Sequence, residues 1–240
     1  MSLTATPDGV LLVDKAAGMT SHDVVALVRR QLQIKKVGHC GTLDPIATGL
    51  LILTLGRGTK IQDLLMSEDK EYVGTLSLGK TTDTQDRAGQ VIEERPVPEL
   101  SDETVRAAFD KYRGDFYQMP PMVSAIKQGG VPLYKLARQG KTVEREPRLV
   151  HVYRYSIDRI ASPEIDFTVL CSKGFYVRTY AHDIGDSLGC GAHLQELRRT
   201  RSGRFDLTRA ITVDEIKNGA PVDILPKILT LPEVSRMRGA

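Results

Sequence analysis

The stretch that decides the fold is Gly38 to Leu51, which reads GHCGTLDPIATGLL. Within twelve residues it holds three glycines, a histidine, an aspartate and a proline, and it runs directly into the apolar segment Leu50–Leu55. This pattern predicts a tight loop that ends where a buried strand begins. The glycines permit unusual backbone angles, and Pro45 biases Asp44 towards an extended conformation. The loop is therefore suited to hold the Asp44 carboxylate in place, as a catalytic acid must be held.

The same residues also fit a purely structural role. An aspartate followed by proline is typical of a helix N-cap followed by the first helical residue, where the carboxylate accepts hydrogen bonds from exposed N–H groups. On these residues alone, Asp44 is either a catalytic group or a cap.

Composition limits the class of protein. With 240 residues, of which 41% are hydrophobic and 26% charged, the chain can bury one sizeable core. The longest apolar runs are too short to span a membrane, and residues 1–8 lack the features of a leader, so we expect a cytoplasmic protein that does not enter membranes. The three cysteines form no CxxC pair, which argues against disulfides and structural zinc. We expect no metal.

The net charge is only +3, but its distribution is uneven. Residues 119–148 carry six basic side chains against two acidic ones, and residues 193–209 carry five arginines against two acids. Two basic patches on a nearly neutral chain suit a polyanion that is bound at defined places. Charged residues on a solvated helix face are the alternative explanation for either patch.

Periodicity and capping signals predict an α+β protein with a mixed, mostly antiparallel sheet flanked by helices. Thr20 and Asp23 have capping-box spacing, as do Thr212 and Glu215 before Gly219. The predicted strands cover 9–13, 50–55, 70–78, 148–160 and 164–172, and the predicted helices cover 21–33, the stretch between Ser101 and Gly114, and a short segment after 56.

Residues 119–148 are the least globular segment. Four prolines and three glycines punctuate the segment alongside its six basic residues. Long insertions of this kind in a compact domain are usually functional or disordered. We therefore predict that residues 119–148 form a long insertion rather than part of the core.

Several stretches resemble, in order, the motifs of the pseudouridine synthases of the bacterial tRNA pseudouridine synthase B type. They include DKAAGMTSHDVV, GHCGTLDPIATG, KEYVGTLSLG, TTDTQDRAG, QMPPMVSAIK with GVPLYKLARQG, CSKGFYVRTYAHDIG and GCGAHLQELRRTRSG. The similarity covers about residues 9–223. It implies a pseudouridine synthase catalytic domain over 9–223 with an RNA-gripping thumb at 119–148. The tail 224–240 is too short for the small RNA-binding PUA domain that many members carry.

The resemblance implies a role for each matched residue. Asp44 is the catalytic residue, Arg178 pairs with it, and Tyr176 belongs to the active site. The remaining residues bind or support the substrate: His39 beneath the displaced nucleotide, Tyr72 stacked on the base, Leu197 packed against it, Asp86 holding Arg178, Lys15 supporting the site, Arg198 and Arg199 facing phosphates, and Lys127, Lys135, Arg138 and Lys141 on the thumb.

The residues alone give plainer interpretations for some of these positions. An aromatic residue in a strand, such as Tyr72, is usually core, Lys15 reads as a surface lysine, and Arg178 as a surface ion pair. Tyr176 and Arg178 stand two apart, so in an extended backbone their side chains would share one face.

The function implied by the resemblance is isomerisation of uridine to pseudouridine in the T-loop of tRNA, conventionally position 55, without a cofactor. The ionised carboxylate would act as a nucleophile or as a base. The expected partner is the T-arm stem-loop of tRNA, and we expect a monomer with no obligatory protein partner.

Two alternatives stand beside this prediction. A non-catalytic tRNA-binding or folding factor would need the same basic patches, but it gives no reason for mounting Asp44 among glycines. A pseudouridine synthase directed by guide RNA, as in archaeal relatives, is disfavoured by the thumb and by the expected lack of a PUA domain.

Overall fold

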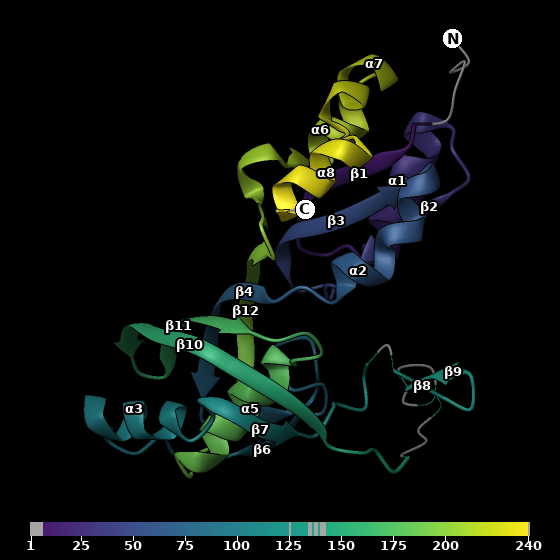
Figure 1. Ribbon diagram of the computed structural model, residues 1–240. Helices are drawn as coiled ribbons and strands as arrows, with labels where there is room; N and C mark the ends of the chain where they lie inside the picture. Colours follow the sequence, from purple (N-terminus) through teal and green to yellow (C-terminus); the bar gives the residue numbers. More distant parts are fainter. Residues whose placement is uncertain (1–6, 125, 134–135, 137–138, 140–142, 240) are drawn as a thin grey trace. The chain divides into compact units, whose positions relative to one another are not determined.

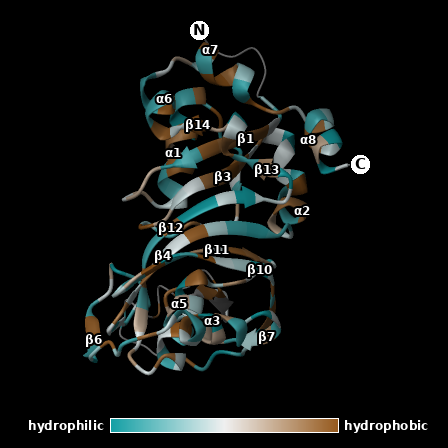
Figure 2. Ribbon diagram, turned by 90° about the vertical axis from the view of Figure 1, so that its left-hand side faces the viewer, coloured by the Kyte–Doolittle hydropathy of each residue, from teal (hydrophilic) through white to brown (hydrophobic). Residues whose placement is uncertain are grey.

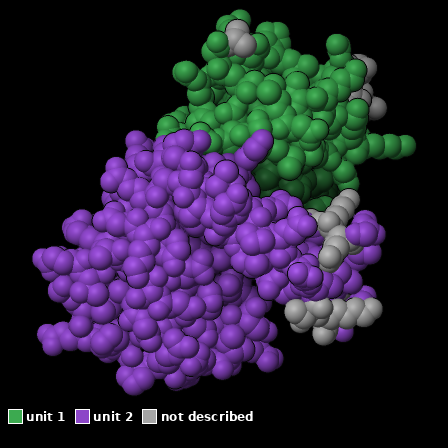
Figure 3. Space-filling view, turned by 60° about the horizontal axis from the view of Figure 1, so that its bottom comes forward, with its two compact units in different colours: residues 1–72, 198–240 green, residues 73–197 purple. Residues whose placement is uncertain are grey.

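The computed structural model describes residues 7–124, 126–133, 136, 139 and 143–239, which form two compact units (Figures 1 and 3). Unit 1 combines residues 1–72 with residues 198–240, and unit 2 contains residues 73–197. Two strands, β4 (Lys70–Leu78) and β12 (Ala192–Ser202), begin in one unit and end in the other. Each unit combines strands with helices, and most strand pairs are antiparallel, so the predicted fold class is confirmed.

The sheet of unit 1 is built around β3 (Thr48–Leu55). Its partner β1 (Gly9–Lys15) runs antiparallel along its whole length, and β14 (Ile211–Thr212) pairs in parallel with the far side of β1. The other edge of β3 is shared. β2 (Val37–Cys40) pairs with its last four residues, and β12 pairs in parallel with its first two. The loop that carries Asp44 therefore leaves the sheet at the point where β2 ends and β12 takes its place.

Both faces of β1 and β3 are buried, which explains why each reads as a continuous apolar run (Figure 2). One face packs in a cluster with residues from α2 (Gln62–Met66), β13 (Phe205–Asp206) and α8 (Leu231–Arg238). The cluster consists of Val10, Leu12, Cys40, Leu50, Ile52, Leu65, Phe205, Leu229 and Val234.

Several helices of unit 1 begin with a capping box. Thr20 caps α1 (Ser21–Leu32) together with Asp23, and Thr212 caps α6 (Val213–Asn218) together with Glu215, as the sequence predicts. The two helices contact each other. The remaining elements of the unit are the short helix α7 (Pro221–Ile224) and the 3₁₀ helices η1 (Gly56–Ile61), η2 (Leu207–Arg209) and η3 (Leu225–Lys227).

The segment expected to be a short tail is part of the folded unit. Val10 and Leu229 exchange backbone hydrogen bonds of 2.9 and 2.8 Å, and Val234 of α8 is buried. Residues from both ends of the chain thus complete one core.

The sheet of unit 2 has the order β4–β11–β10–β7. β10 (Arg148–Ala161) lies in its middle and runs antiparallel to both β11 (Glu164–Cys171) and β7 (Gly114–Gln118). Two small hairpins lie outside this sheet, formed by β5 (Lys80–Thr82) with β6 (Val91–Glu94) and by β8 (Lys127–Gln128) with β9 (Val131–Pro132).

Aromatic side chains form the core of unit 2 under α3 (Asp102–Asp110) and α5 (Val177–Ser187). The Phe109 ring centroid lies 5.4 Å from that of Tyr155, 5.9 Å from that of Phe167 and 5.7 Å from that of Tyr180. These contacts join a residue of α3 to the sheet and to α5.

Two local predictions are wrong. The glycine-rich stretch does not begin as a loop, because β2 already includes Gly38 and His39. The segment around Tyr176 and Arg178 is not extended: Tyr176 is the N-cap of α5 and Arg178 is its second residue. Among the described residues, no helix is both long and apolar enough to cross a membrane.

Candidate functional site

The turn that carries Asp44 is fixed by backbone contacts on both sides of the aspartate. Ser21 Oγ donates to Leu43 O at 3.1 Å and accepts from Leu43 N at 2.8 Å. Gly18 N donates to Pro45 O at 2.8 Å, and Ala47 N donates to Asp44 O at 3.0 Å. These bonds hold the main chain of Leu43, Asp44 and Pro45, and so fix the turn from which the Asp44 side chain extends.

Asp44 does not begin a helix. Pro45 and Ile46 form a turn, and the chain then enters β3. The N-cap alternative for Asp44 is therefore wrong.

Arg199 connects the two ends of this loop. Its side chain, on β12, is only 1% exposed; Nε donates to Leu50 O at 2.7 Å and an Nη atom donates to Gly41 O at 3.1 Å. Gly41 precedes the Asp44 turn and Leu50 follows it. The expectation that Arg199 faces an RNA phosphate is wrong, because its guanidinium is buried in unit 1.

Gly49 has to be glycine for the same packing. It pairs with Arg199 across the β3–β12 ladder, its φ is +95°, and a Cβ at this position would lie 2.2 Å from Arg199 O. A side chain would therefore push β12 away from the loop.

Lys15 is fully buried, which corrects its interpretation as a surface lysine. Nζ donates to Met19 O at 2.7 Å and to Ala16 O at 2.9 Å, and so closes the loop that also contains Gly18. Burial lowers the pKa of the Lys15 ammonium to about 8, and the nearby charge of Asp44 opposes that shift. Lys15 thus places a positive charge within electrostatic range of Asp44 at neutral pH.

His39 points from β2 towards His22 of α1, with ring centroids 5.2 Å apart. Burial lowers the pKa of His39 to about 4, with smaller contributions from His22 and Arg199. Its imidazole is therefore neutral under ordinary conditions. Its Nδ1 is buried and has no hydrogen-bond partner in the part of the chain that the structure describes.

The other two predicted residues of unit 1 differ in exposure. Tyr72 lies on β4 and is 8% exposed. Arg198 precedes Arg199 on β12, and its side chain lies on the opposite face of the strand. It forms an ion pair of 2.7 Å with Asp14. With a side chain 42% exposed, Arg198 remains accessible to a phosphate.

The predicted association of Asp86 with Arg178 is present in unit 2. Arg178 Nε lies 3.9 Å from Asp86 Oδ2, and both side chains are buried. The Arg178 guanidinium also donates to Thr84 O at 2.9 Å and to Val123 O at 2.6 Å. Asp86 itself accepts from Thr84 Oγ1 at 2.7 Å and from Ala88 N at 3.0 Å. The Arg178 guanidinium is therefore buried and held in a fixed orientation. The interpretation of Arg178 as part of a surface ion pair is wrong.

Tyr176 is fixed through its backbone. The Gln118 side chain accepts from Tyr176 N at 2.8 Å and donates to Tyr176 O at 3.0 Å. This pair of bonds ties the start of α5 to the end of β7.

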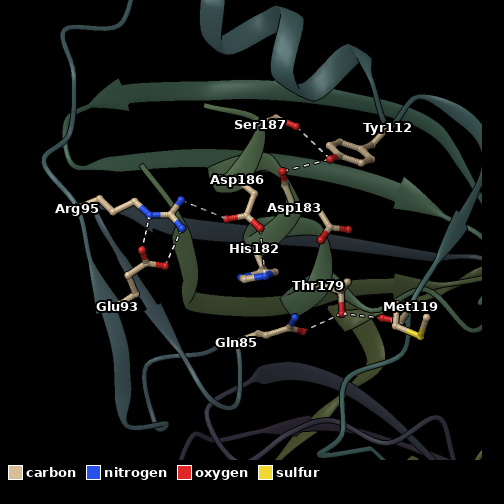
Figure 4. A network of polar contacts seen from close by, with 10 residues as sticks. All are labelled: Gln85, Glu93, Arg95, Tyr112, Met119, Thr179, His182, Asp183, Asp186 and Ser187. Carbon is tan, nitrogen blue, oxygen red and sulfur yellow. Dashed lines mark hydrogen bonds and ion pairs between the residues drawn. The ribbon is translucent and has the colours of Figure 1, made fainter. Parts of the chain in front are cut away.

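Hydrogen bonds along α5 hold the helix that carries Arg178 (Figure 4). Thr179 Oγ1 donates to Gln85 Oε1 at 2.9 Å near the start of α5. Towards its end, Tyr112 OH donates to Asp183 O at 3.1 Å and lies 3.0 Å from Ser187 Oγ. These contacts fix the helix in its rotation and along its axis.

The predicted residues thus fall into two groups within the described chain. Lys15, His39, Asp44 and Arg199 surround one loop of unit 1, whereas Asp86 and Arg178 pair in unit 2 beside the backbone of Tyr176. Leu197 lies on β12 and is 8% exposed. Of the thumb residues, Lys127 lies in β8, where only its backbone is described, and Lys135, Arg138 and Lys141 lie outside the described residues.

Sequence reasoning missed Ser21 and gave Arg199 a phosphate-binding role instead of a structural one. Ser21 acts on Leu43, which is 22 residues away, and Arg199 acts on Leu50, 149 residues away. Neither contact leaves a local pattern. The β-strand alternation from Arg198 to Arg199 is the one signal that separates an exposed arginine from a buried one.

A family model supplies the deciding comparison. The model described as TruB family pseudouridylate synthase (N terminal domain) matches residues 29–177, and the tRNA pseudouridylate synthase B C-terminal domain matches residues 178–222. The chain belongs to the TruB family. The boundary between the two matches falls at the start of α5, next to Arg178.

Curated TruB relatives match almost the whole chain. The tRNA pseudouridine synthase B of Opitutus terrae is 53% identical over 229 residues, which are 95% of this chain and 91% of that protein. The protein of the same name from Geobacter sulfurreducens is 50% identical over 225 residues, covering 94% of this chain and 74% of that protein.

Solved structures of similar proteins are longer. A Cbf5-Nop10-Gar1 complex contains a chain that matches with a TM-score of 0.73 and 28% identity, covering 95% of this chain and 62% of that chain. An H/ACA RNP bound to a substrate RNA containing 2′-deoxyuridine matches with a TM-score of 0.65 and 29% identity, covering 86% of this chain and 51% of that chain. This TruB chain thus spans about half to three fifths of the length of those chains.

Proposed function

We propose that the chain isomerises a uridine of tRNA to pseudouridine, at the T-loop position conventionally numbered 55, with Asp44 as the catalytic carboxylate. Membership of the TruB family and the names of the curated relatives support the activity and the tRNA substrate. The observation that carries the assignment of Asp44 is its mounting in a turn whose backbone is fixed through Ser21, Gly18 and Arg199, within electrostatic range of the buried ammonium of Lys15.

The reaction is an isomerisation, so uridine and pseudouridine have the same composition. The bond between N1 of uracil and C1′ of ribose breaks, the base turns, and C5 bonds to C1′ while the C5 proton departs and N1 gains a proton. No electrons are gained or lost overall, so no redox partner is needed. In these reaction steps a carboxylate can act as a nucleophile or as the base that removes a proton.

Nearby positive charge keeps a partly buried carboxylate ionised. Lys15, with a pKa of about 8, supplies that charge at neutral pH. This environment supports Asp44 in its charged form.

The remaining residues are assigned to the substrate. Arg178, oriented by Asp86, serves the same reaction together with Tyr176, and Tyr72 and Leu197 contact the base once it has left its stack, an extrusion that costs a few kcal/mol. Arg198 and the basic residues of the thumb, Lys127, Lys135, Arg138 and Lys141, contact phosphates. The expected RNA element is the T-arm stem-loop.

Mapping the modified nucleotide tests this proposal. Unmodified tRNA and a T-arm hairpin labelled with tritium at uracil C5 are incubated with the purified chain. We expect tritium release from both and pseudouridine only at the T-loop uridine, and a hairpin with cytidine at that position should release none. Tight binding of both RNAs without release would contradict the proposal and favour a tRNA-binding factor.

A further inference from the structure

The loop between β5 and β6 holds one residue in an uncommon backbone conformation. The φ of Gln85 is +62°, in the left-handed region, where residues with a Cβ are rarely found. In the part of the chain that the structure describes, Gln33 is the only other non-glycine residue with a positive φ. Gln33 is the C-cap of α1, where left-handed backbone is common. Gln85 follows no helix, so a helix end does not account for its conformation.

The residues on either side of Gln85 contact the Arg178 guanidinium. Arg178 Nη1 donates to Thr84 O at 2.9 Å, and Arg178 Nε lies 3.9 Å from Asp86 Oδ2. Thr84 Oγ1 donates to the other oxygen of that carboxylate, Asp86 Oδ1, at 2.7 Å. The chain therefore bends at Gln85, between the two groups that hold Arg178.

Backbone hydrogen bonds hold Gln85 in this conformation. Gln85 N donates to Thr82 O at 3.0 Å, and Leu194 N of β12 donates to Gln85 O at 3.0 Å. Arg87 N donates in turn to Leu194 O at 3.0 Å. Both backbone groups of Gln85 are thus used within unit 2. A sparsely populated backbone conformation persists where its surroundings fix it in this way, and such residues cluster at functional sites.

The side chain of Gln85 joins the loop to α5 (Figure 4). Its Oε1 accepts from Thr179 Oγ1 at 2.9 Å. Thr179 follows Arg178 directly on the helix and is 2% exposed. The other acceptor within reach of this hydroxyl, Met119 O, is 3.5 Å away, so the bond to Gln85 is the stronger of the two. Two adjacent loop residues, Thr84 and Gln85, therefore bind two adjacent residues of α5.

We propose that Gln85 is a positioning residue for Arg178. Its bond to Thr179 fixes the rotation of the first turn of α5, and with it the direction from which Arg178 reaches the loop. A catalytic group displaced by about 1 Å can slow a reaction about 100-fold, so a bond of this kind affects the rate without touching the substrate. The inference rests on the proposed function, which assigns Arg178 to the reaction.

Two substitutions in the full chain remove this bond from opposite ends. Gln85→Met keeps a side chain of similar length but has no oxygen acceptor, and Thr179→Val keeps the shape of threonine but has no hydroxyl. Thr179→Ser keeps the hydroxyl and is the conservative counterpart. The kcat and KM of each variant are measured by tritium release from the T-arm hairpin, and urea unfolding gives its stability.

We expect Gln85→Met and Thr179→Val each to lower kcat about tenfold, with KM close to that of wild type. The double variant should be no slower than either single variant, because both remove the same bond. Thr179→Ser should regain most of the rate lost in Thr179→Val. A wild-type kcat in folded Gln85→Met, or losses that multiply in the double variant, would overturn the proposal.

Glycine at the same position separates positioning from a merely structural role. Gln85→Gly relieves the left-handed backbone and lacks the acceptor, so it should be at least as stable as Gln85→Met but equally slow. Gln33→Gly is the matched control, because it relieves the same conformation at the end of α1 and should keep the wild-type rate. If the rates of the two Gln85 variants instead follow their stabilities, Gln85 only holds the loop together and the proposal is wrong.

A measurement that needs no activity distinguishes this proposal from the proposed function. The Nε–H group of a buried arginine gives its own signal in a proton–nitrogen NMR spectrum, and Arg178→Lys identifies that of Arg178. The signal should shift in Gln85→Met and stay in place in Gln33→Gly. An unchanged signal in Gln85→Met overturns the positioning role. If the signal shifts but the wild-type chain makes no pseudouridine, Gln85 still positions Arg178 and the proposed function is wrong.

Discussion

Arg199 shows how a single buried side chain can position the loop that carries Asp44. Its guanidinium binds the carbonyls of Gly41 and Leu50, one before and one after the Asp44 turn. Hydrogen bonds from a charged donor contribute about 1.5–3 kcal/mol each, and the cost of burying the charge offsets part of this. The net effect is to hold two strands and a loop in one arrangement.

Arg199→Met should therefore destabilise the chain and slow turnover. It removes the donor from the buried carbonyl of Leu50 and from the partly buried carbonyl of Gly41, so we expect a loss of about 2 kcal/mol in the free energy of unfolding. Arg198→Gln, at the neighbouring position, removes an ion pair of a half-exposed side chain and should cost less than about 1 kcal/mol. Urea unfolding of both variants measures the difference. Equal stability of the two would contradict the positioning role of Arg199.

The lowered pKa of His39 predicts that the stability of the chain depends on pH. Its pKa is about 4 in the folded chain against an ordinary value of 6.5, so the unfolded chain takes up the proton first as the pH falls. The stabilising contribution of neutral His39 is complete above pH 6.5 and is lost as the pH falls towards 4. The loss should be about 3 kcal/mol, since one pKa unit corresponds to about 1.36 kcal/mol.

His39→Gln removes this titration while keeping a polar side chain. Stability of the variant, measured by urea unfolding at a series of pH values, should fall less steeply than that of wild type between pH 6.5 and 4. Parallel curves would show that His39 is not held neutral by its surroundings.

At the residue scale, the sequence pointed to Asp44 but not to what holds it. Glycines and a proline around an acid leave a visible local signal. The burial of Lys15 and Arg199 depends on which strands become neighbours of β3. No sequence pattern around either residue shows this long-range pairing.

At the scale of elements, the close approach of β3 and β12 should depend on Gly49. Gly49→Ala introduces a Cβ 2.2 Å from Arg199 O at a backbone φ of +95°. Gly189→Ala is the matched control, because its φ is +81° and no atom lies within 4 Å of its added Cβ. Both substitutions incur a backbone penalty of about 1 kcal/mol.

Only Gly49→Ala should incur a further cost from displacing β12, and it should also lower pseudouridine formation because Arg199 moves with the strand. Thermal unfolding and tritium release measure the two effects. A Gly49→Ala variant as stable and active as Gly189→Ala would show that β12 does not need this contact.

Elements with their own start and stop signals could be predicted. Helices α1 and α6 have capping boxes, and β4 alternates along its length. By contrast, α5 begins after Tyr176, which makes no side-chain cap hydrogen bond, so its start leaves no capping signal in the sequence. β2 has four residues and is a strand only because β3 lies beside it.

At the scale of the whole molecule, the sequence motifs identified the family, whereas the division of the chain followed from contacts. Unit 1 takes residues from both ends of the chain, and Val10 binds Leu229 across that separation. Such pairing explains why residues 224–240 read as a tail and yet contribute Val234 to a core.

The central claim is that the Asp44 carboxylate performs the reaction. Asp44→Asn keeps the size of the side chain and removes its charge. The turn should persist, because the hydrogen bonds that hold it use backbone atoms of Leu43, Asp44 and Pro45. Asp63→Asn, at an exposed position on α2, controls for the loss of one negative charge.

The measurement that tests this claim most directly is the rate of pseudouridine formation in a T-arm hairpin by Asp44→Asn. We expect the rate to fall by several orders of magnitude, while hairpin affinity and thermal stability stay close to those of wild type and of Asp63→Asn. A folded Asp44→Asn variant within about tenfold of the wild-type rate, a barrier change of only about 1.4 kcal/mol, would contradict the account.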